Sequence, residues 1–305
     1  MRDAFFEELI ACAKKNTRVV FLTADHGTQA LKKFQIKMPN RYYNMGIAEQ
    51  NMIGVAAGLA ASGKIVFVFG ITPFVSLRVL EQLSMDIAAM NLPVNIISIG
   101  AGFTYSVDGP THHGLQDISA IASIPNITIY NSSDPANTKK FVHMAIKNEK
   151  PHYIRIEKEC LFPLSRIMEK TNGFSFIKKN RKNILILTTG ALIHKLLEYL
   201  DKSERAIQRQ VSLIDVYKLK PIENKLLDEI KKYKKLLIVE EGYSSGLAKE
   251  LVFQLALNGS VPLVKICAIK EEFVFEYDTR AKLIEKNLLN SSKFINIIKE
   301  LIISK

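Results

Sequence analysis

One glutamate at the start of an apolar helical segment is the first feature of this sequence that could carry chemistry. Glu49 lies in the stretch NMGIAEQN at residues 44–51, and nearly every position from Ile53 to Ala61 is small or apolar. We expect such a helix to be packed on all sides, which keeps its first carboxyl group away from water. A buried carboxyl group can share a proton with a ligand nitrogen. The alternative interpretation is an ordinary acidic residue beside the positive end of the helix dipole.

A second polar segment, DGPTHHG at residues 108–114, contains the only pair of adjacent histidines in the sequence. Gly109 and Pro110 predict a tight turn, and polar loops that follow strands are where α/β proteins carry their chemistry. His112 and His113 are therefore candidate functional residues. Turn stabilisation is the alternative role, above all for Asp108, because Asp-Gly is a common turn pair.

Together, the two segments resemble the pyrimidine-binding half of the thiamine-diphosphate enzymes of the transketolase family. The stretches TPFVSLR at 72–78, EQ at 81–82 and NLPV at 91–94 also fit that family in order and spacing. In the second half, Lys220-Pro221 and VEEG at 239–242 resemble the family's C-terminal domain. The resemblance covers nearly the whole chain. It implies an α/β fold with two doubly wound domains, a pyrimidine-binding domain followed by a smaller transketolase C-terminal-type domain.

The hydrophobic pattern agrees with this fold. Short apolar, β-branched runs alternate with segments of helical periodicity, which predicts parallel sheets with helices on both faces. Strands are expected at 18–23, 65–69, 94–99, 127–130, 152–156, 183–188, 211–216, 236–240 and 263–266. Helices are expected at 2–14, 48–61, 74–91, 117–123, 135–147, from 190 to about 202, and at 223–232, 244–257, 279–287 and 291–303. The predicted domains are 1–162 and 183–305, joined by a linker at 163–182.

The resemblance implies a role in cofactor binding for three residues. Glu49 matches the glutamate that hydrogen-bonds N1′ of the thiamine pyrimidine and favours the imino tautomer, whose 4′-nitrogen removes the C2 proton of the thiazolium. Phe74 matches the aromatic residue that stacks on the pyrimidine, with Val75 as the alternative. Asp25 matches an aspartate near the cofactor and the dimer interface.

The resemblance also implies that the DGPTHHG loop contacts the sugar substrates. His112 matches the family histidine that faces the reacting carbon and hydrogen-bonds donor or acceptor hydroxyls. Asp108 matches the residue that reads a substrate hydroxyl and so favours ketose donors. His113 replaces a glutamine common at this position and is expected to be a second polar contact. The expected catalytic residues are thus Glu49 and His112.

Full-length family members hold the diphosphate and its magnesium ion through a Gly-Asp-Gly motif and a downstream Asn. No Gly-Asp-Gly occurs in this sequence, so we expect no metal ligands from this chain. The sequence therefore resembles the C-terminal subunit of a split transketolase. A separate N-terminal subunit is expected to supply the Mg²⁺ ligands and the diphosphate site, with α2β2 as the expected complex.

The expected activity is the transfer of a two-carbon ketol unit from a ketose donor to an aldose acceptor. The alternatives are an enzyme like 1-deoxyxylulose-5-phosphate synthase, a 2-oxo-acid dehydrogenase β subunit, which usually lacks DGPTH, and a non-catalytic regulatory subunit. The phosphate-binding His and Arg of the family have no counterparts near Gly100 and near Glu157, and Arg155 is as often structural. The acceptor could thus be unphosphorylated, differently phosphorylated or nucleotide-linked.

Composition narrows the possible partners. The formal net charge is +12, but the lysines are spread through 179–182, 231–235 and the helices without an aromatic-studded basic block. This pattern is typical of a solvated surface and not of a nucleic-acid-binding protein. An apolar run of about 18 residues, which a membrane span requires, is absent, and the three cysteines lack metal-ligand spacing. A reduced, cytoplasmic setting is expected.

Overall fold

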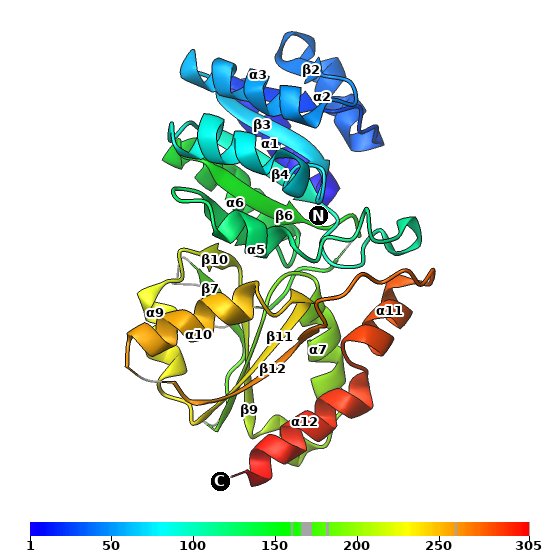
Figure 1. The fold of residues 1–305 in the computed structure, drawn as a ribbon, viewed down its shortest axis with the longest axis vertical. Helices are drawn as coiled ribbons and strands as arrows, with labels where there is room; N and C mark the ends of the chain where they lie inside the picture. The colour runs from blue at the N-terminus through cyan, green and yellow to red at the C-terminus, as the bar shows by residue number, and fades with distance from the viewer. Residues whose placement is uncertain (160, 166–172, 181–182, 260, 305) are drawn as a thin grey trace.

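The computed structural model describes residues 1–159, 161–165, 173–180, 183–259 and 261–304, and Figure 1 shows its elements. The strands are β1 Val19–Thr23, β2 Tyr42–Asn44, β3 Ile65–Ile71, β4 Val94–Ile99, β5 Thr128–Asn131, β6 His152–Ile156, β7 Phe174–Lys178, β8 Ile184–Thr188, β9 Val211–Val216, β10 Lys218–Lys220, β11 Lys235–Tyr243 and β12 Leu263–Ile269. The α-helices are α1 Arg2–Lys15, α2 Gln29–Lys37, α3 Glu49–Ala61, α4 Leu80–Gln82, α5 Asp117–Ala122, α6 Pro135–Asn148, α7 Leu192–Asp201, α8 Arg205–Gln208, α9 Asn224–Ile230, α10 Leu247–Leu257, α11 Arg280–Asn287 and α12 Ser291–Ile303. Short helices of other types are η1 Pro39–Arg41, η2 Leu77–Val79, the π-helical η3 Leu83–Ala88, and η4 Ser106–Asp108.

The strands form two sheets, one above the other in Figure 1. The first has seven strands in the order β10-β5-β6-β4-β3-β1-β2, and the second has five in the order β12-β11-β8-β9-β7. Neighbouring strands are parallel except at β10 and β7, which each pair antiparallel at the edge of a sheet. The predicted α/β fold with two domains is confirmed. Among the described helices, none has the length and apolar character needed to cross a membrane.

The two faces of the first sheet bury different side chains because residues alternate along each strand. On β3, Val66 packs with Met52 of α3 on one face, whereas Phe67 and Phe69 pack on the other. The Phe69 ring lies 5.3 Å from that of Phe6 in α1. α3 and α1 therefore cover opposite faces. Since β1, β3 and β4 are parallel, the loops that follow them leave the same edge of the sheet, where α/β proteins bind ligands.

Several elements differ from the expected ones. α2 and β2 occupy residues expected to be loop, and the helix expected at 74–91 is broken into turn, η2, α4 and η3. Near the start of that segment, the Ser76 hydroxyl donates to the Thr72 carbonyl at 2.6 Å, a side-chain bond that competes with helical pairing. β7 lies inside the predicted linker 163–182, of which 166–172 and 181–182 are outside the described residues. β10 returns from the second half to pair with β5.

A buried arginine joins the two sheets. Arg280, at the start of α11, donates from Nη2 to Glu157 just after β6 at 3.0 Å and to Glu241 in β11 at 2.8 Å. The three side chains are 12%, 2% and 7% exposed. Glu241 also accepts the backbone N–H of Phe103 at 2.9 Å, and Glu157 accepts the hydroxyl of Thr104 at 2.6 Å. One guanidinium and two carboxylates thus hold the loop after β4 against both sheets.

Removing this guanidinium should strongly destabilise the fold. Arg280→Met keeps the aliphatic volume but leaves Glu157 and Glu241 buried without their cation, which should lower the free energy of unfolding by about 3–5 kcal/mol. Urea unfolding followed by circular dichroism measures the change. The control, Lys202→Met, removes an exposed ion pair with Glu198 and should leave the unfolding midpoint nearly unchanged. Equally small shifts in both variants would contradict this role of Arg280.

Candidate functional site

Glu49 is positioned by a turn that is tied to the end of β1. The side-chain oxygen of Asn44 accepts the backbone N–H groups of Asp25 at 2.9 Å and Gly46 at 3.1 Å. Gly46 has a φ of 69°, which glycine adopts without strain, so the chain can turn directly into α3. Glu49 then begins the helix and is 6% exposed. Its carboxyl group is therefore at the positive end of the helix dipole but shielded from water.

Asp25 lies beside this turn, as part of the loop that follows β1. It is an exposed residue with a φ of 55°, and its carboxylate accepts a hydrogen bond from Asn44 Nδ2 at 3.1 Å. Its neighbour His26 packs edge-on against Phe69, with 5.2 Å between the ring centroids. Burial, with the nearby Arg2, lowers the pKa of His26. Asp25 therefore helps to hold the turn that leads to Glu49, and its side chain is exposed to solvent.

Arg78, in the loop that follows β3, connects two of the predicted site residues. Its Nη1 lies 2.9 Å from Glu49 Oε1, and its Cζ lies 4.1 Å from the centroid of the Phe74 ring. Gln50 Nε2 donates to the backbone carbonyl of Arg78 at 3.3 Å. Phe74 is half-buried, whereas Val75 is fully buried, so only the Phe74 ring is accessible for stacking. The resemblance to the family assigned no role to Arg78.

His112 also contacts Phe74. The two rings meet edge to face with 5.0 Å between centroids, and Tyr105 lies 6.2 Å from His112. The Nδ1 atom of His112 hydrogen-bonds the hydroxyl of Thr111 at 2.9 Å, which leaves Nε2 to face a ligand. A continuous series of contacts therefore runs from Glu49 through Arg78 and Phe74 to His112. The structure thus brings together the predicted site residues Glu49, Phe74 and His112 from three separate segments of the chain.

The neighbours of His112 in the DGPTHHG loop lie in different surroundings. Asp108 ends η4 and is exposed, and its backbone N–H donates to Tyr105 O at 3.1 Å. His113 is 6% exposed, and its ring meets Phe103 edge to face at 5.0 Å. Burial lowers the pKa of His113. His113 lines a pocket of about 380 Å³ whose other walls come from both halves of the chain: Pro73, Leu77, Pro110, Thr111, Leu115, Gln116, Tyr243, Phe273, Val274 and Phe275.

The end of this loop is held by a buried ion pair that the sequence did not suggest. Arg155 of β6 lies 2.9 Å from Asp117 and donates from Nη2 to the carbonyl of Gly114 at 2.9 Å. The hydroxyl of Tyr153 donates to Asp117 at 2.8 Å. Burial raises the pKa of Asp117, although the adjacent Arg155 opposes the shift. Arg155 is 3% exposed, so its role here is structural and not the binding of a phosphate group.

α3 is covered on one face only by this chain, in contrast to the expected packing on all sides. The exposed residues of α3 include Gln50, Asn51, Gly54, Gly58 and Ala61. A Cβ atom added to Gly54 or Gly58 would meet no atom within 4 Å. Several apolar side chains near this helix in sequence or in space are also exposed, among them Ile47 at 81% and Met85 at 60%. Small and apolar residues occur on the exposed face of α3 as well as on its buried face, so the composition alone predicted packing on all sides.

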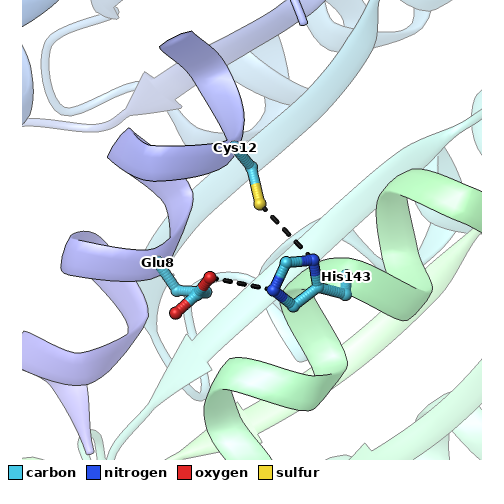
Figure 2. A group of neighbouring side chains, drawn as sticks. All are labelled: Glu8, Cys12 and His143. Carbon is cyan, nitrogen blue, oxygen red and sulfur yellow. Dashed lines mark hydrogen bonds and ion pairs between the residues drawn. The ribbon is translucent and has the colours of Figure 1, made fainter. Parts of the chain in front are cut away.

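Glu8, Cys12 and His143, residues of types that can bind a metal ion, lie together between α1 and α6 (Figure 2). This group is on the face of the sheet opposite α3. The imidazole of His143 contacts Cys12 Sγ through Nδ1 at 3.7 Å and Glu8 through Nε2 at 2.8 Å. One candidate ligand atom from each residue lies within 4.8 Å of the others, and His143 uses a different nitrogen for each of its two contacts, so the three side chains form a hydrogen-bonded chain. Lys139 also lies 3.9 Å from Glu8 and competes for its carboxylate. This arrangement is a hydrogen-bond network and does not contribute to the site at Glu49.

Comparisons with known proteins identify the family of both halves of the chain. Residues 1–162 match the transketolase, pyrimidine binding domain, and residues 175–274 match the transketolase, C-terminal domain. A 6-deoxy-6-sulfo-D-fructose transketolase subunit of a Clostridium species is 31% identical over 274 residues, which are 87% of this chain and 84% of that protein. The 1-deoxy-D-xylulose-5-phosphate synthase of Fusobacterium nucleatum is 31% identical over 312 residues, 98% of this chain but 50% of that protein.

A solved structure of a split gene transketolase, an inactive beta4 tetramer, has the same fold. Its TM-score is 0.87 at 28% identity, and the match covers 98% of this chain and 97% of that one. The two family matches follow each other along the chain in the same order as the two sheets described above. The chain belongs to the transketolase family, whose members depend on thiamine diphosphate, and it corresponds to the C-terminal subunit of split transketolases.

Proposed function

We propose that Glu49, Phe74 and His112 form the pyrimidine-binding half of the active site of a transketolase that moves a two-carbon ketol unit from a ketose to an aldose. The observation that carries the proposal is the buried Glu49 carboxylate beside the half-buried ring of Phe74, with the flat guanidinium of Arg78 in contact with both. An aminopyrimidine is also flat and presents nitrogen atoms in its plane. These residues therefore fit the pyrimidine ring of thiamine diphosphate.

Thiamine diphosphate, when bound, supplies the carbon nucleophile that breaks and re-forms the bond next to the sugar carbonyl. Glu49 would hold the proton that faces N1′ of the pyrimidine, and Phe74 would stack on the ring. His112 would present Nε2 to substrate hydroxyls, because Thr111 engages its other nitrogen. Asp108, exposed at the start of the same loop, would favour ketose donors.

We propose supporting roles for Asp25 and His113. Asp25 would support the cofactor site through its bonds to Asn44, which position the turn before α3. His113 would be a second polar contact for a substrate group that reaches the pocket between the two halves of the chain. Its burial makes this contact secondary to that of His112.

A separate subunit would hold the diphosphate and Mg²⁺, in a complex with two copies of each chain. The exposed face of α3, with Gly54 and Gly58 open to approach, supports a subunit contact beside Glu49. The similarity to a transketolase subunit and to a split gene transketolase supports the same division of the site. The positive net charge would attract anionic sugars.

The second candidate activity is that of 1-deoxyxylulose-5-phosphate synthase, because one such enzyme is 31% identical over nearly the whole chain. The two activities differ in the donor. A reconstituted complex that consumes ketoses without releasing CO₂ supports the transketolase, whereas CO₂ release from pyruvate supports the synthase. A panel of phosphorylated and unphosphorylated aldoses would then identify the acceptor.

Replacing the carboxyl group of Glu49 tests the proposed function directly. Glu49→Gln should lower turnover of the reconstituted complex by about 10²- to 10⁴-fold, because an amide cannot hold and return the proton at N1′. Steady-state turnover is the measurement, and thermal unfolding should show that the fold is intact. Glu81→Gln, an exposed residue of the neighbouring helix α4, is the matched control. Near-normal turnover of Glu49→Gln would contradict the role proposed for Glu49.

The two histidines of the loop should differ in their effect on catalysis. His112→Ala should lower turnover more than His113→Ala, since only His112 contacts Phe74 and can face the reacting groups. Turnover of both variants is measured with several ketose donors. Equal losses, or an indifferent His112→Ala variant, would contradict the assigned roles.

The isolated chain should not bind the cofactor tightly, because it would supply only the pyrimidine half of the site. Calorimetric titration with thiamine diphosphate and Mg²⁺, with and without the partner subunit, measures this difference. Tight binding should appear only with the partner. If this chain alone binds the cofactor tightly, the divided site is wrong.

A further inference from the structure

The side chain of Arg78 lies between Glu49 and Phe74, the two residues that we propose to bind the pyrimidine ring. Its Nη1 atom makes a polar contact with Glu49 at 2.9 Å, and its Cζ stacks over the Phe74 ring at 4.1 Å from the centroid. The same guanidinium makes both contacts. The pyrimidine would need the same two contacts, so Arg78 and the cofactor cannot occupy this place together.

The chemistry of the guanidinium explains why it can stand there. It is flat and delocalised, donates N–H groups in its plane, and stacks on aromatic rings. The carboxylate of Glu49 is almost fully buried, and a buried carboxylate without a counter-charge is unfavourable. Arg78 supplies this counter-charge and covers the ring face of Phe74.

We infer that Arg78 is a placeholder: its side chain occupies the place of the pyrimidine ring. It must leave both Glu49 and Phe74 before the cofactor can bind. The inference rests on the proposed function of these two residues. When Arg78 leaves, N1′ of the pyrimidine can take the place of the guanidinium beside the Glu49 carboxyl group. Arg78 is thus a positioning residue that acts through Glu49.

The surroundings of Arg78 allow this movement. Its side chain is 44% exposed, so the guanidinium can rotate into solvent without displacing the core. Its backbone lies in η2, where the carbonyl is held by Gln50 at 3.3 Å. Side-chain rotation of this kind takes place in picoseconds to nanoseconds. The loop that carries Phe74 can therefore stay in place while the site opens.

Cofactor affinity tests the inference without relying on activity. In the complex with the partner subunit, Arg78→Met should lower the Kd of thiamine diphosphate by about five- to thirtyfold, as expected from the loss of one partly exposed ion pair and one cation–π contact. Arg78→Lys keeps the charge but not the flat group, and its Kd should fall between those of the wild type and Arg78→Met. Calorimetry in the presence of Mg²⁺ gives each value.

The isolated chain provides a second measurement. Binding of 4-amino-5-hydroxymethyl-2-methylpyrimidine, the ring without the diphosphate, can be followed by ligand-observed nuclear magnetic resonance, and Arg78→Met should bind it more tightly than the wild type. The matched control is Arg18→Met, since Arg18 is equally exposed at 44% but pairs with Glu149, which is itself 43% exposed. This control should leave both affinities unchanged. An unchanged or weakened affinity in Arg78→Met would overturn the inference.

Failure of the proposed function gives a different result. Glu49→Gln and Phe74→Ala should each raise the Kd in the same titration if these residues hold the pyrimidine. If they do so while Arg78→Met does not lower the Kd, only the placeholder role is wrong. If neither Glu49→Gln nor Phe74→Ala changes the Kd, the proposed pyrimidine site is wrong, and the inference about Arg78 is wrong with it.

Discussion

The position of the DGPTHHG loop depends on charged groups buried between the two sheets. Arg280 and Glu241 hold the segment that precedes this loop, through the backbone of Phe103, and Arg155 holds the end of the loop at the carbonyl of Gly114. Interactions of this kind are strong in a medium of low polarity and intolerant of a missing partner. The edge-to-face contact of His112 with Phe74 is therefore a consequence of the packing between the domains as much as of the loop itself.

The strands of both sheets could be predicted because parallel strands buried on both faces are continuous apolar runs, as in 65–71 and 94–99. Three edge strands, β2, β7 and β10, could not be predicted in this way. β2 is three residues long and mostly exposed. β7 and β10 pair antiparallel with a segment far away or across the domain boundary, and β10 alternates Lys218, Leu219 and Lys220. Such short, half-polar segments have no local signal that separates them from loops.

Motif matches were sufficient to select Glu49, Phe74 and His112, and the structure brings these residues into one series of contacts. The matches could not show which side chains touch. Arg78 is part of a matching motif, but the match gives no information on the position of its side chain between Glu49 and Phe74. Likewise, adjacent residues of a turn point in different directions, so His113 faces the second domain while His112 does not.

The return of β10 to the first sheet means that the two domains share a structural element. β10 covers Ile129 and Tyr130 of β5, which would otherwise be an open edge of the first sheet. Open edges of this kind pair readily with other chains and lead to aggregation. The first domain therefore does not complete its own sheet, and the two domains should fold as one cooperative unit. A C-terminal domain exchanged between relatives would have to bring its own closing strand with it.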